Sequence, residues 1–205
     1  EMPKMNGIDF LKQLIPKHPI PVVVVSSLPI NALDALKAGA VDFVRKPPAG
    51  VPGALESFLA ELREKVKVAA HAKVQQHYAA TSCSLVSRLA ANFLPASSND
   101  VIAIGASTGG TEAIIEVVKN LPTTTPGIVI VQHMPANFTT LYAQRLDKIC
   151  RMHAKEAADY DRVVPGQIIL GAGEYHLTLK KDARGYYVRS RRGEKVSGHC
   201  PSVDV

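Results

Sequence analysis

The sequence predicts an α/β protein built on doubly wound parallel sheets, and three observations carry this prediction. In the first third of the chain, short β-branched runs alternate with segments of helical spacing. Further on, an apolar run over 101–104 leads into Gly-x-Ser-x-Gly, and helical spacing follows over 111–121. Another apolar run, over 128–131, ends in Gln132 and His133. Continuous apolar runs of this kind are typical of parallel strands that are buried on both faces.

Residues 1–67 form the first predicted region, which alternates helix, strand, helix, strand and helix. The spacing of its apolar residues predicts helices over 7–14, 31–38 and 55–78 and strands over 21–25 and 41–44. Gly39 follows the second helix, where glycine is a common C-terminal signal. Two strands alone do not bury both faces of a parallel sheet, so we interpret this region as the second half of a larger domain.

A connector over 68–99 and a third region over 100–205 complete the predicted organisation. The connector begins as helix, becomes rich in serine and alanine, and ends in a polar stretch that predicts a domain boundary. The third region begins with alternating strands and helices and becomes richer in strands after 166. There the sequence predicts short strands over 167–170, 175–179 and 186–189, with a hairpin turn at 182–185.

The composition favours a soluble globular protein. Of the 205 residues, 46% are hydrophobic and 20% are charged, which is the balance of folded domains and not of disordered chains. No apolar run approaches the roughly 20 residues that span a bilayer, so we expect no membrane insertion. Three cysteines without a Cys-x-x-Cys pair favour a reducing compartment, and hence the cytoplasm, over a zinc site or a disulfide framework. The net charge of +6 is compatible with an acidic partner.

The segment 105–109 has the form of a nucleophile elbow, in which a strand ends in a sharp turn that exposes a serine hydroxyl. If the strands before Ser107 and His133 are parallel neighbours, the two side chains meet at the carboxyl edge of the sheet, where open α/β sheets place their sites. A hydroxyl beside an imidazole is the minimum apparatus for nucleophilic acyl chemistry. Glycine-rich turns also bind dinucleotides. Dinucleotide-binding folds, however, have an acidic residue after the next strand, where this chain has Gln132.

Other candidate residues receive simpler interpretations. His153, His176 and His199 lack metal-ligand spacing, and we expect them to be surface or hydrogen-bonded residues. Asp204 is a tempting partner for the imidazole, but its position is typical of a helix start. A basic cluster with interleaved tyrosines has no nucleic-acid recognition module beside it, so we expect a solvated hairpin face, suited to an acidic surface, and no nucleic-acid partner. Its cations are Arg184, Arg189, Arg191, Arg192 and Lys195.

Residues 1–47 resemble the second half of a flavodoxin-like response-regulator receiver domain. The resemblance implies that Ser26 is the switch hydroxyl, Phe43 the switch aromatic and Lys46 the lysine that pairs with a phosphoryl group. It places the phosphoacceptor aspartate two residues before Glu1, whose main-chain carbonyl matches a ligand of the Mg²⁺ that receiver phosphorylation requires. The motifs that carry the resemblance are Met2-Pro3-x-Met5-Asn6-Gly7, Val22-Val-Val-Val-Ser26-Ser27 and Ala38-Gly39-Ala40-x-Asp42-Phe43-Val44-x-Lys46-Pro47.

The third region resembles, over 101–205, the catalytic domain of the chemotaxis protein-glutamate methylesterase family (CheB type). That family also has this domain order, with a receiver domain first, then a helical linker, then the catalytic domain. The resemblance implies that Ser107, Thr108 and His133 belong to the active site, with a triad aspartate beyond Val205, so we expect a chain truncated at both ends. The matching motifs are Gly105-Ala-Ser-Thr-Gly-Gly-Thr-Glu-Ala-Ile114, Gln132-His133-Met134-Pro135-x-x-Phe138-Thr139, Lys155-Glu156-Ala157, Pro165-Gly166 and Pro201-Ser-Val-Asp-Val205.

The resemblance implies a methylesterase and glutaminase that needs no cofactor for hydrolysis and works in chemotaxis adaptation. Ser107 would attack the side-chain carbonyl of a methylated glutamate on a chemoreceptor, and His133 would carry the proton. Phosphorylation of the receiver by a chemotaxis histidine kinase would uncover the site. Because both aspartates are expected outside 1–205, we expect this stretch alone to be nearly inactive. The alternative is a noncatalytic module that docks on receptors or takes part in a phosphorelay.

Overall fold

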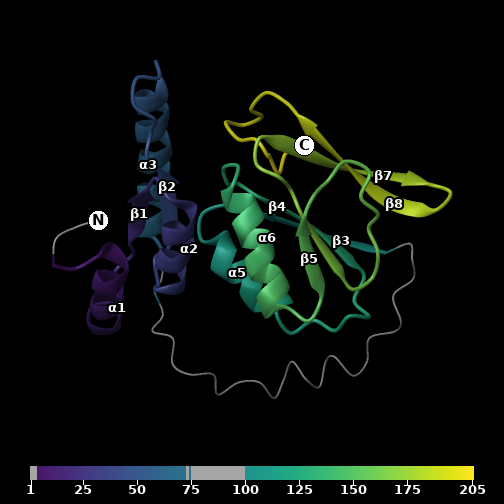
Figure 1. The fold of residues 1–205 in the computed structure, drawn as a ribbon, viewed down its shortest axis with the longest axis horizontal. Coiled ribbons are helices and arrows are strands. Elements are labelled where there is room, and N and C mark those ends of the chain that lie inside the picture. Colours follow the sequence, from purple (N-terminus) through teal and green to yellow (C-terminus); the bar gives the residue numbers. More distant parts are fainter. Residues whose placement is uncertain (1–3, 73, 75–99) are drawn as a thin grey trace. The chain divides into compact units, whose positions relative to one another are not determined.

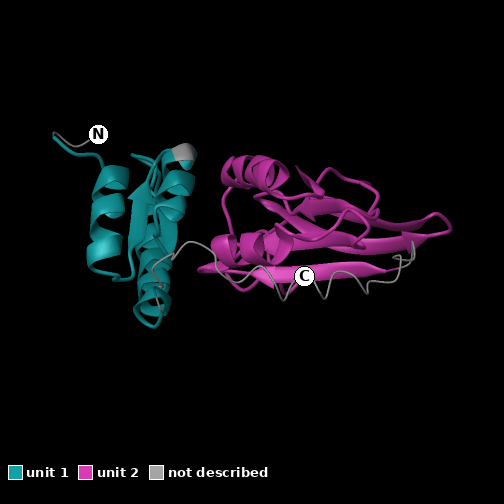
Figure 2. Ribbon diagram, turned by 90° about the horizontal axis from the view of Figure 1, so that it is seen from below, with its two compact units in different colours: residues 1–80 teal, residues 81–205 magenta. Residues whose placement is uncertain are grey.

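The computed structural model describes residues 4–72, 74 and 100–205 (Figure 1). The chain divides into two compact units, Glu1–Ala80 and Thr81–Val205 (Figure 2). The predicted connector over 68–99 lies largely outside the described residues, so its organisation stays a prediction. Within the described parts of the chain, no helix is long and apolar enough to cross a membrane. Each unit contains a parallel sheet of its own.

The first unit is a two-stranded parallel sheet with three helices. Strand pairing runs in register from Val23 with Asp42 to Ser26 with Arg45. The structure confirms the predicted order of helices and strands in this region. The elements are α1 (Gly7–Lys17), β1 (Val23–Ser26), α2 (Pro29–Lys37), β2 (Asp42–Arg45) and α3 (Ala54–Ala70). The larger buried side chains of the unit are Leu11, Ile15, Leu33, Leu36, Phe43 and Val44.

Local sequence signals set several ends of these elements. The Asn6 side chain accepts a hydrogen bond from the Asp9 main-chain N–H at 2.9 Å and so caps α1. After α2, Gly39 adopts a φ of +102°, and a Cβ there would lie 3.1 Å from Ile15. The predicted end of the third helix is wrong, because α3 ends at Ala70 and residues 71 and 72 are not helical. No glycine or proline marks that end, so the apolar spacing alone predicted a helix that is too long.

The second unit is built on a four-stranded parallel sheet in the order β3-β4-β6-β5. The central strands β4 and β6 are almost fully buried, as their continuous apolar sequences predict. The structure confirms that β3 and β4 are parallel neighbours. The strands are β3 (Val101–Ala106), β4 (Gly127–Gln132), β5 (His153–Glu156) and β6 (Gln167–Leu170), and the helices are α5 (Gly110–Val118) and α6 (Phe138–Ile149).

Two elements of this unit were not predicted from the sequence. The edge strand β5 reads His-Ala-Lys-Glu, with one buried alanine and no β-branched residue. Helix α6 follows Asn137, which has a φ of +69° and no side-chain hydrogen bond to the helix. Pairing along β6 therefore decides β5, whereas α6 has the apolar spacing of a helix and lacks only a recognisable start signal.

A β-hairpin completes the second unit. The structure confirms the two strands and the turn predicted here, although both strands run longer than predicted. Leu177 and Val188 of the hairpin share an apolar cluster with Val129 of β4 and Ile169 of β6. The hairpin thus packs on the parallel sheet through its apolar side chains. Its strands are β7 (Tyr175–Asp182) and β8 (Gly185–Arg192).

Candidate active site

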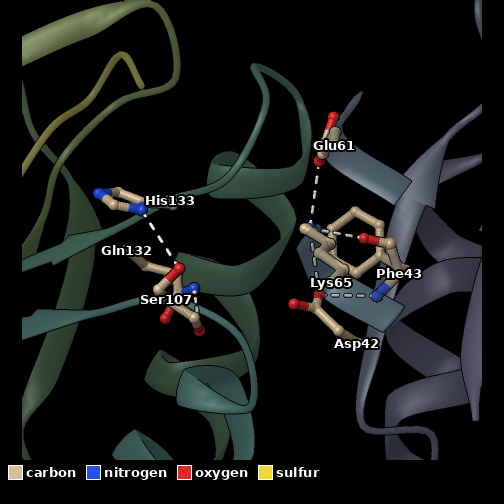
Figure 3. A network of polar contacts seen from close by, with 7 residues as sticks. All are labelled: Asp42, Phe43, Glu61, Lys65, Ser107, Gln132 and His133. Atoms are coloured by element: carbon tan, nitrogen blue, oxygen red, sulfur yellow. Dashed lines mark hydrogen bonds and ion pairs between the residues drawn. The ribbon is translucent and has the colours of Figure 1, made fainter. Parts of the chain in front are cut away.

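Ser107 and His133 lie together at the carboxyl edge of the four-stranded sheet, as the sequence predicts. Each follows the last residue of a strand, and those last residues, Ala106 and Gln132, are partners in the parallel register. The His133 main-chain N–H donates to the Ala106 carbonyl at 3.2 Å. The His133 Nδ1 lies 3.2 Å from the Ser107 Oγ (Figure 3). This hydrogen-bond distance allows proton transfer between hydroxyl and imidazole.

The turn after Ser107 depends on two glycines. Gly109 adopts a φ of +76°, a left-handed conformation that glycine takes without strain. Gly110 begins α5 and donates its N–H to the Ser107 carbonyl at 2.8 Å. A Cβ on Gly110 would lie 2.3 Å from the Gln132 Oε1 and 2.6 Å from the Ala106 Cβ. The two glycines therefore let the helix start close against both strands while the serine stays exposed.

Gln132 holds the main chain of the nucleophile turn. Its side chain is 3% exposed, and its Nε2 donates to the Ser107 carbonyl at 2.9 Å. That carbonyl thus accepts hydrogen bonds from the Gln132 side chain and from the Gly110 main chain. In the sequence, Gln132 is part of a family motif and evidence against a dinucleotide site, and neither observation gives it a structural role of its own. A polar side chain at the end of a buried apolar strand was the signal that it is hydrogen-bonded inside the protein.

Two contacts join the helices that follow the serine and the histidine. The Tyr142 hydroxyl, on α6, donates to the Thr111 carbonyl in the first turn of α5 at 2.7 Å. Arg145 forms a two-pronged ion pair with Glu112, with distances of 2.6 and 3.1 Å. Burial raises the pKa of the Tyr142 hydroxyl well above its usual range, so this group stays a proton donor. Both contacts fix the start of α5 against α6 and hold the turn at Ser107 in place.

The ring of His133 also contacts a histidine from much later in the chain. His199 stacks on it with ring centroids 3.8 Å apart and planes inclined by 12°. Spacing alone had not pointed to this contact, because nothing in the sequence places residue 199 near residue 133. His153 and His176, which were named with His199 from the sequence, are hydrogen-bonded, as expected. His153 Nδ1 lies 2.6 Å from a carboxylate oxygen, and His176 Nε2 lies 2.7 Å from a main-chain carbonyl.

Two other residues named from the sequence lie in turns. Thr108 follows Ser107 in the nucleophile turn and is partly buried. At the other end of the unit, the Asp204 main-chain N–H donates to the Ser202 hydroxyl at 3.2 Å. Residues 201–205 form bends and a turn, and the predicted helix start at Asp204 stays a prediction because only Val205 follows it among the described residues. A hydroxyl can cap such a turn just as it caps a helix.

The basic cluster on the hairpin is partly neutralised by ion pairs within the unit. Arg189 pairs with Asp159 at 2.7 Å, and Arg192 pairs with Glu174 at 2.5 Å. Arg162, which lies outside the cluster, pairs with Asp182 at the hairpin turn at 2.6 Å. The hydrogen-bonded Arg162 guanidinium lowers the pKa of the Asp182 carboxyl to about 2. The cluster therefore includes arginines that organise the hairpin, which agrees with a solvated structural face.

In the first unit, Ser26 and Lys46 lie at the same edge of the sheet. Ser26 ends β1, and its carbonyl accepts the Lys46 main-chain N–H at 3.0 Å. Phe43 is 2% exposed, and the Lys65 ammonium from α3 lies 5.1 Å from its ring centroid (Figure 3). Lys65 also donates to the Phe43 carbonyl at 2.7 Å and lies 3.3 Å from Asp42 Oδ1. A partly buried cation thus connects α3 to β2 at the expected switch aromatic.

The Mg²⁺ that the receiver resemblance implies has no complete set of ligands in this chain's described residues. Glu1 lies outside them. Across 4–72, 74 and 100–205, no group of three or more His, Cys, Asp and Glu side chains is placed to hold a metal ion. Ser26 and Lys46 offer a hydroxyl and an ammonium, and neither is a typical ligand of Mg²⁺.

The fold and the site together define a parallel α/β protein with a paired serine and histidine at the carboxyl edge of its sheet. Residues 102–205 match the family described as CheB methylesterase. The chain belongs to this family.

Curated relatives are similar to the chain over its whole length. It is 49% identical over 212 residues to the protein-glutamate methylesterase/protein-glutamine glutaminase of Syntrophotalea carbinolica. It is 48% identical over 210 residues to the protein-glutamate methylesterase/protein-glutamine glutaminase 2 of Syntrophomonas wolfei. These alignments cover 100% of this chain but 60% and 59% of those proteins. A crystal structure of the Thermotoga maritima CheB methylesterase catalytic domain is 36% identical, with a TM-score of 0.49 over 52% of this chain and 57% of that chain.

Proposed function

We propose that the second unit hydrolyses glutamate methyl esters, and deamidates glutamines, on chemoreceptors. The observation that carries the proposal is the 3.2 Å contact between the Ser107 Oγ and the His133 Nδ1. Membership of the CheB methylesterase family supports it, as do the two activities in the names of the relatives. A methyl ester and a primary amide differ in the leaving group, so one acyl-transfer site can serve both.

In the proposed mechanism, the Ser107 hydroxyl attacks the side-chain carbonyl and gives its proton to His133. The imidazole returns this proton to the leaving methanol or ammonia, and an acyl-serine ester remains. Water, deprotonated by the same imidazole, then releases the glutamate side chain. The oxyanion would meet the N-terminal end of α5, whose first main-chain N–H groups lack acceptors inside the helix. We expect Thr108, next to the nucleophile, to contact the substrate.

The test is methanol release from a methylated chemoreceptor by the complete gene product. We expect Ser107→Ala to lower the rate by about four orders of magnitude or more, the usual cost of removing a nucleophile from such a site. Ser190→Ala is the matched control, because this serine lies on the hairpin strand β8. An unchanged rate for Ser107→Ala would contradict the proposal. Receptor binding without any methanol release by the unmodified protein would favour the noncatalytic docking module instead.

We also propose that the first unit is a receiver half through which a chemotaxis histidine kinase controls the esterase. Ser26 and Lys46 lie at one sheet edge, and a hydroxyl and an ammonium are groups that bind phosphoryl oxygens. The phosphoacceptor aspartate is expected in sequence outside 1–205. Lys46 is exposed and follows β2, so replacing it leaves the core of the unit untouched.

Acetyl phosphate with Mg²⁺ provides the test of this control. We expect it to stimulate methanol release by the complete gene product and to lose that effect in Lys46→Ala, because the phosphoryl group then lacks its cationic partner. Lys12→Ala, which changes an exposed lysine of α1, is the control and should keep the stimulation. Full stimulation of Lys46→Ala would rule out the receiver assignment of this lysine.

A further inference from the structure

We infer that His199 is a positioning residue for His133, because its ring provides a flat surface that holds the imidazole in the plane where Nδ1 faces Ser107. The inference rests on the proposed function of the serine and the histidine. It adds to that site a side chain from the segment between the hairpin and residue 205. We assign His199 a positioning role and no catalytic one, since its described ring contact is with His133.

The His133 ring has a different contact at its edge and at its face. At the edge, Nδ1 lies 3.2 Å from the Ser107 Oγ. At the face, the His199 ring lies nearly parallel, with centroids 3.8 Å apart. The torsion that turns an imidazole about its Cβ–Cγ bond has broad minima, so a hydrogen bond at the edge of the ring restrains its tilt only weakly. A second ring in van der Waals contact restricts that torsion, because any tilt drives the two rings into each other.

The segment that carries His199 is itself held by its main chain and by a neighbouring side chain. Val196 and His199 exchange two main-chain hydrogen bonds, both of 3.0 Å. Further on, Val203 packs so closely on β3 that a Cβ added at Gly105 would lie 2.5 Å from its Cγ1. Neither contact uses the imidazole of His199. The ring can therefore be replaced while the segment stays anchored beside the strand that leads to Ser107.

The experiment measures labelling of Ser107 in the complete gene product by a fluorophosphonate, which reports an activated serine and needs no receptor. At pH 8, where ordinary imidazoles are neutral, we expect His199→Ala to lower the labelling rate constant about three- to tenfold, as loss of an aromatic contact predicts. His199→Phe keeps a flat ring and should return the rate to within about twofold of the unmodified protein. His199→Leu, bulky but not planar, should stay slow.

A spectroscopic signature separates positioning from general stabilisation. The stacked ring should shift the His133 Cε1 proton upfield in the unmodified protein and in His199→Phe, but not in His199→Ala or His199→Leu. Tyr160→Ala removes one ring of another stacked pair in the same unit, Tyr160 with Tyr187, and should leave the labelling rate unchanged. The leucine variant keeps the comparison informative if the alanine variant does not fold.

The outcomes distinguish this inference from the proposed function. Equal labelling rates in the unmodified protein, His199→Leu and His199→Phe would overturn the positioning role, and so would a phenylalanine variant as slow as the leucine variant. Strong, His199-dependent labelling without methanol release from a methylated receptor would contradict the proposed substrate while supporting the positioning role. Labelling that survives His133→Ala would overturn both, because the serine would then be activated without the imidazole.

Discussion

At the scale of single residues, Gly110 controls how closely α5 approaches the strands that carry the site. Gly110→Ala should lower the free energy of unfolding by about 1–3 kcal/mol, because the new Cβ meets Gln132 and Ala106 at less than van der Waals distance. It should also slow fluorophosphonate labelling, because Gln132 must move and its hydrogen bond to the Ser107 carbonyl weakens. Urea unfolding and labelling rates of the complete gene product measure the two effects.

Gly50→Ala is the control for this substitution. Gly50 has a φ of +76° but nothing within 4 Å of an added Cβ, so its replacement strains the main chain without a clash and away from the site. Its labelling rate should equal that of the unmodified protein. Normal stability and normal labelling of Gly110→Ala would show that the helix start can shift at no cost, against the tight packing described above.

How much of the site the sequence predicts also depends on the residue. Ser107 and His133 were identified because each follows an apolar run, and parallel strands bring such positions to one edge. Gln132 and His199 were not, since their roles depend on contacts at 2.9 Å and 3.8 Å that only the folded chain creates. Glu1, expected to offer a carbonyl to Mg²⁺, lies outside the described residues and stays a prediction.

At the scale of elements, an ion pair between Asp182 at the turn of the β7–β8 hairpin and Arg162, which lies outside the hairpin, stabilises the turn. The Arg162 guanidinium donates two hydrogen bonds to Asp182, at 2.7 and 2.6 Å, and thereby lowers the pKa of that carboxyl to about 2. Because the folded pKa lies below the ordinary value near 4, this interaction stabilises the fold at pH above about 4. Its contribution is lost as the pH falls through about 2.

Arg162→Gln should raise the pKa of Asp182 back toward its ordinary value, because the glutamine keeps a donor but removes the charge. Carboxyl carbon chemical shifts followed through an acid titration of the complete gene product measure this change. Arg189→Gln is the reciprocal control. It should raise the lowered pKa of Asp159, which Arg189 holds by a hydrogen bond, and leave Asp182 unchanged. An Asp182 titration that is the same with and without Arg162 would contradict the assigned cause.

Among the elements, the sequence predicts those whose own residues carry a clear apolar pattern or turn signal. β4 and β6 are continuous apolar runs, and the hairpin strands are separated by a recognisable turn. β5 was missed because its formation depends on pairing with β6 and not on its own residues. α6 was missed because it follows Asn137, which has a positive φ and no capping side-chain hydrogen bond. The contacts from α6 to α5 that steady the nucleophile turn were missed with it.

At the scale of the whole molecule, the two units have separate cores and separate sheets. The predicted regions, 1–67 and 100–205, fall within different units, whereas the boundaries of the connector between them stay predictions because 73 and 75–99 lie outside the described residues. Leu36 is 1% exposed in the first unit and Ile168 is 0% exposed in the second. Each therefore probes the core of its own unit.

Leu36→Ala and Ile168→Ala are each expected to cost about 2–5 kcal/mol in the unit that contains them, because each leaves a cavity in a close-packed core. Hydrogen exchange followed by mass spectrometry resolves the two units peptide by peptide in the complete gene product. Leu36→Ala should speed exchange in 4–72 and leave fluorophosphonate labelling of Ser107 intact, whereas Ile168→Ala should speed exchange in 100–205 and reduce labelling. An equal rise of exchange in both units for either variant would mean that the chain unfolds as one cooperative body, and its two cores would then have to be treated as a single folding unit.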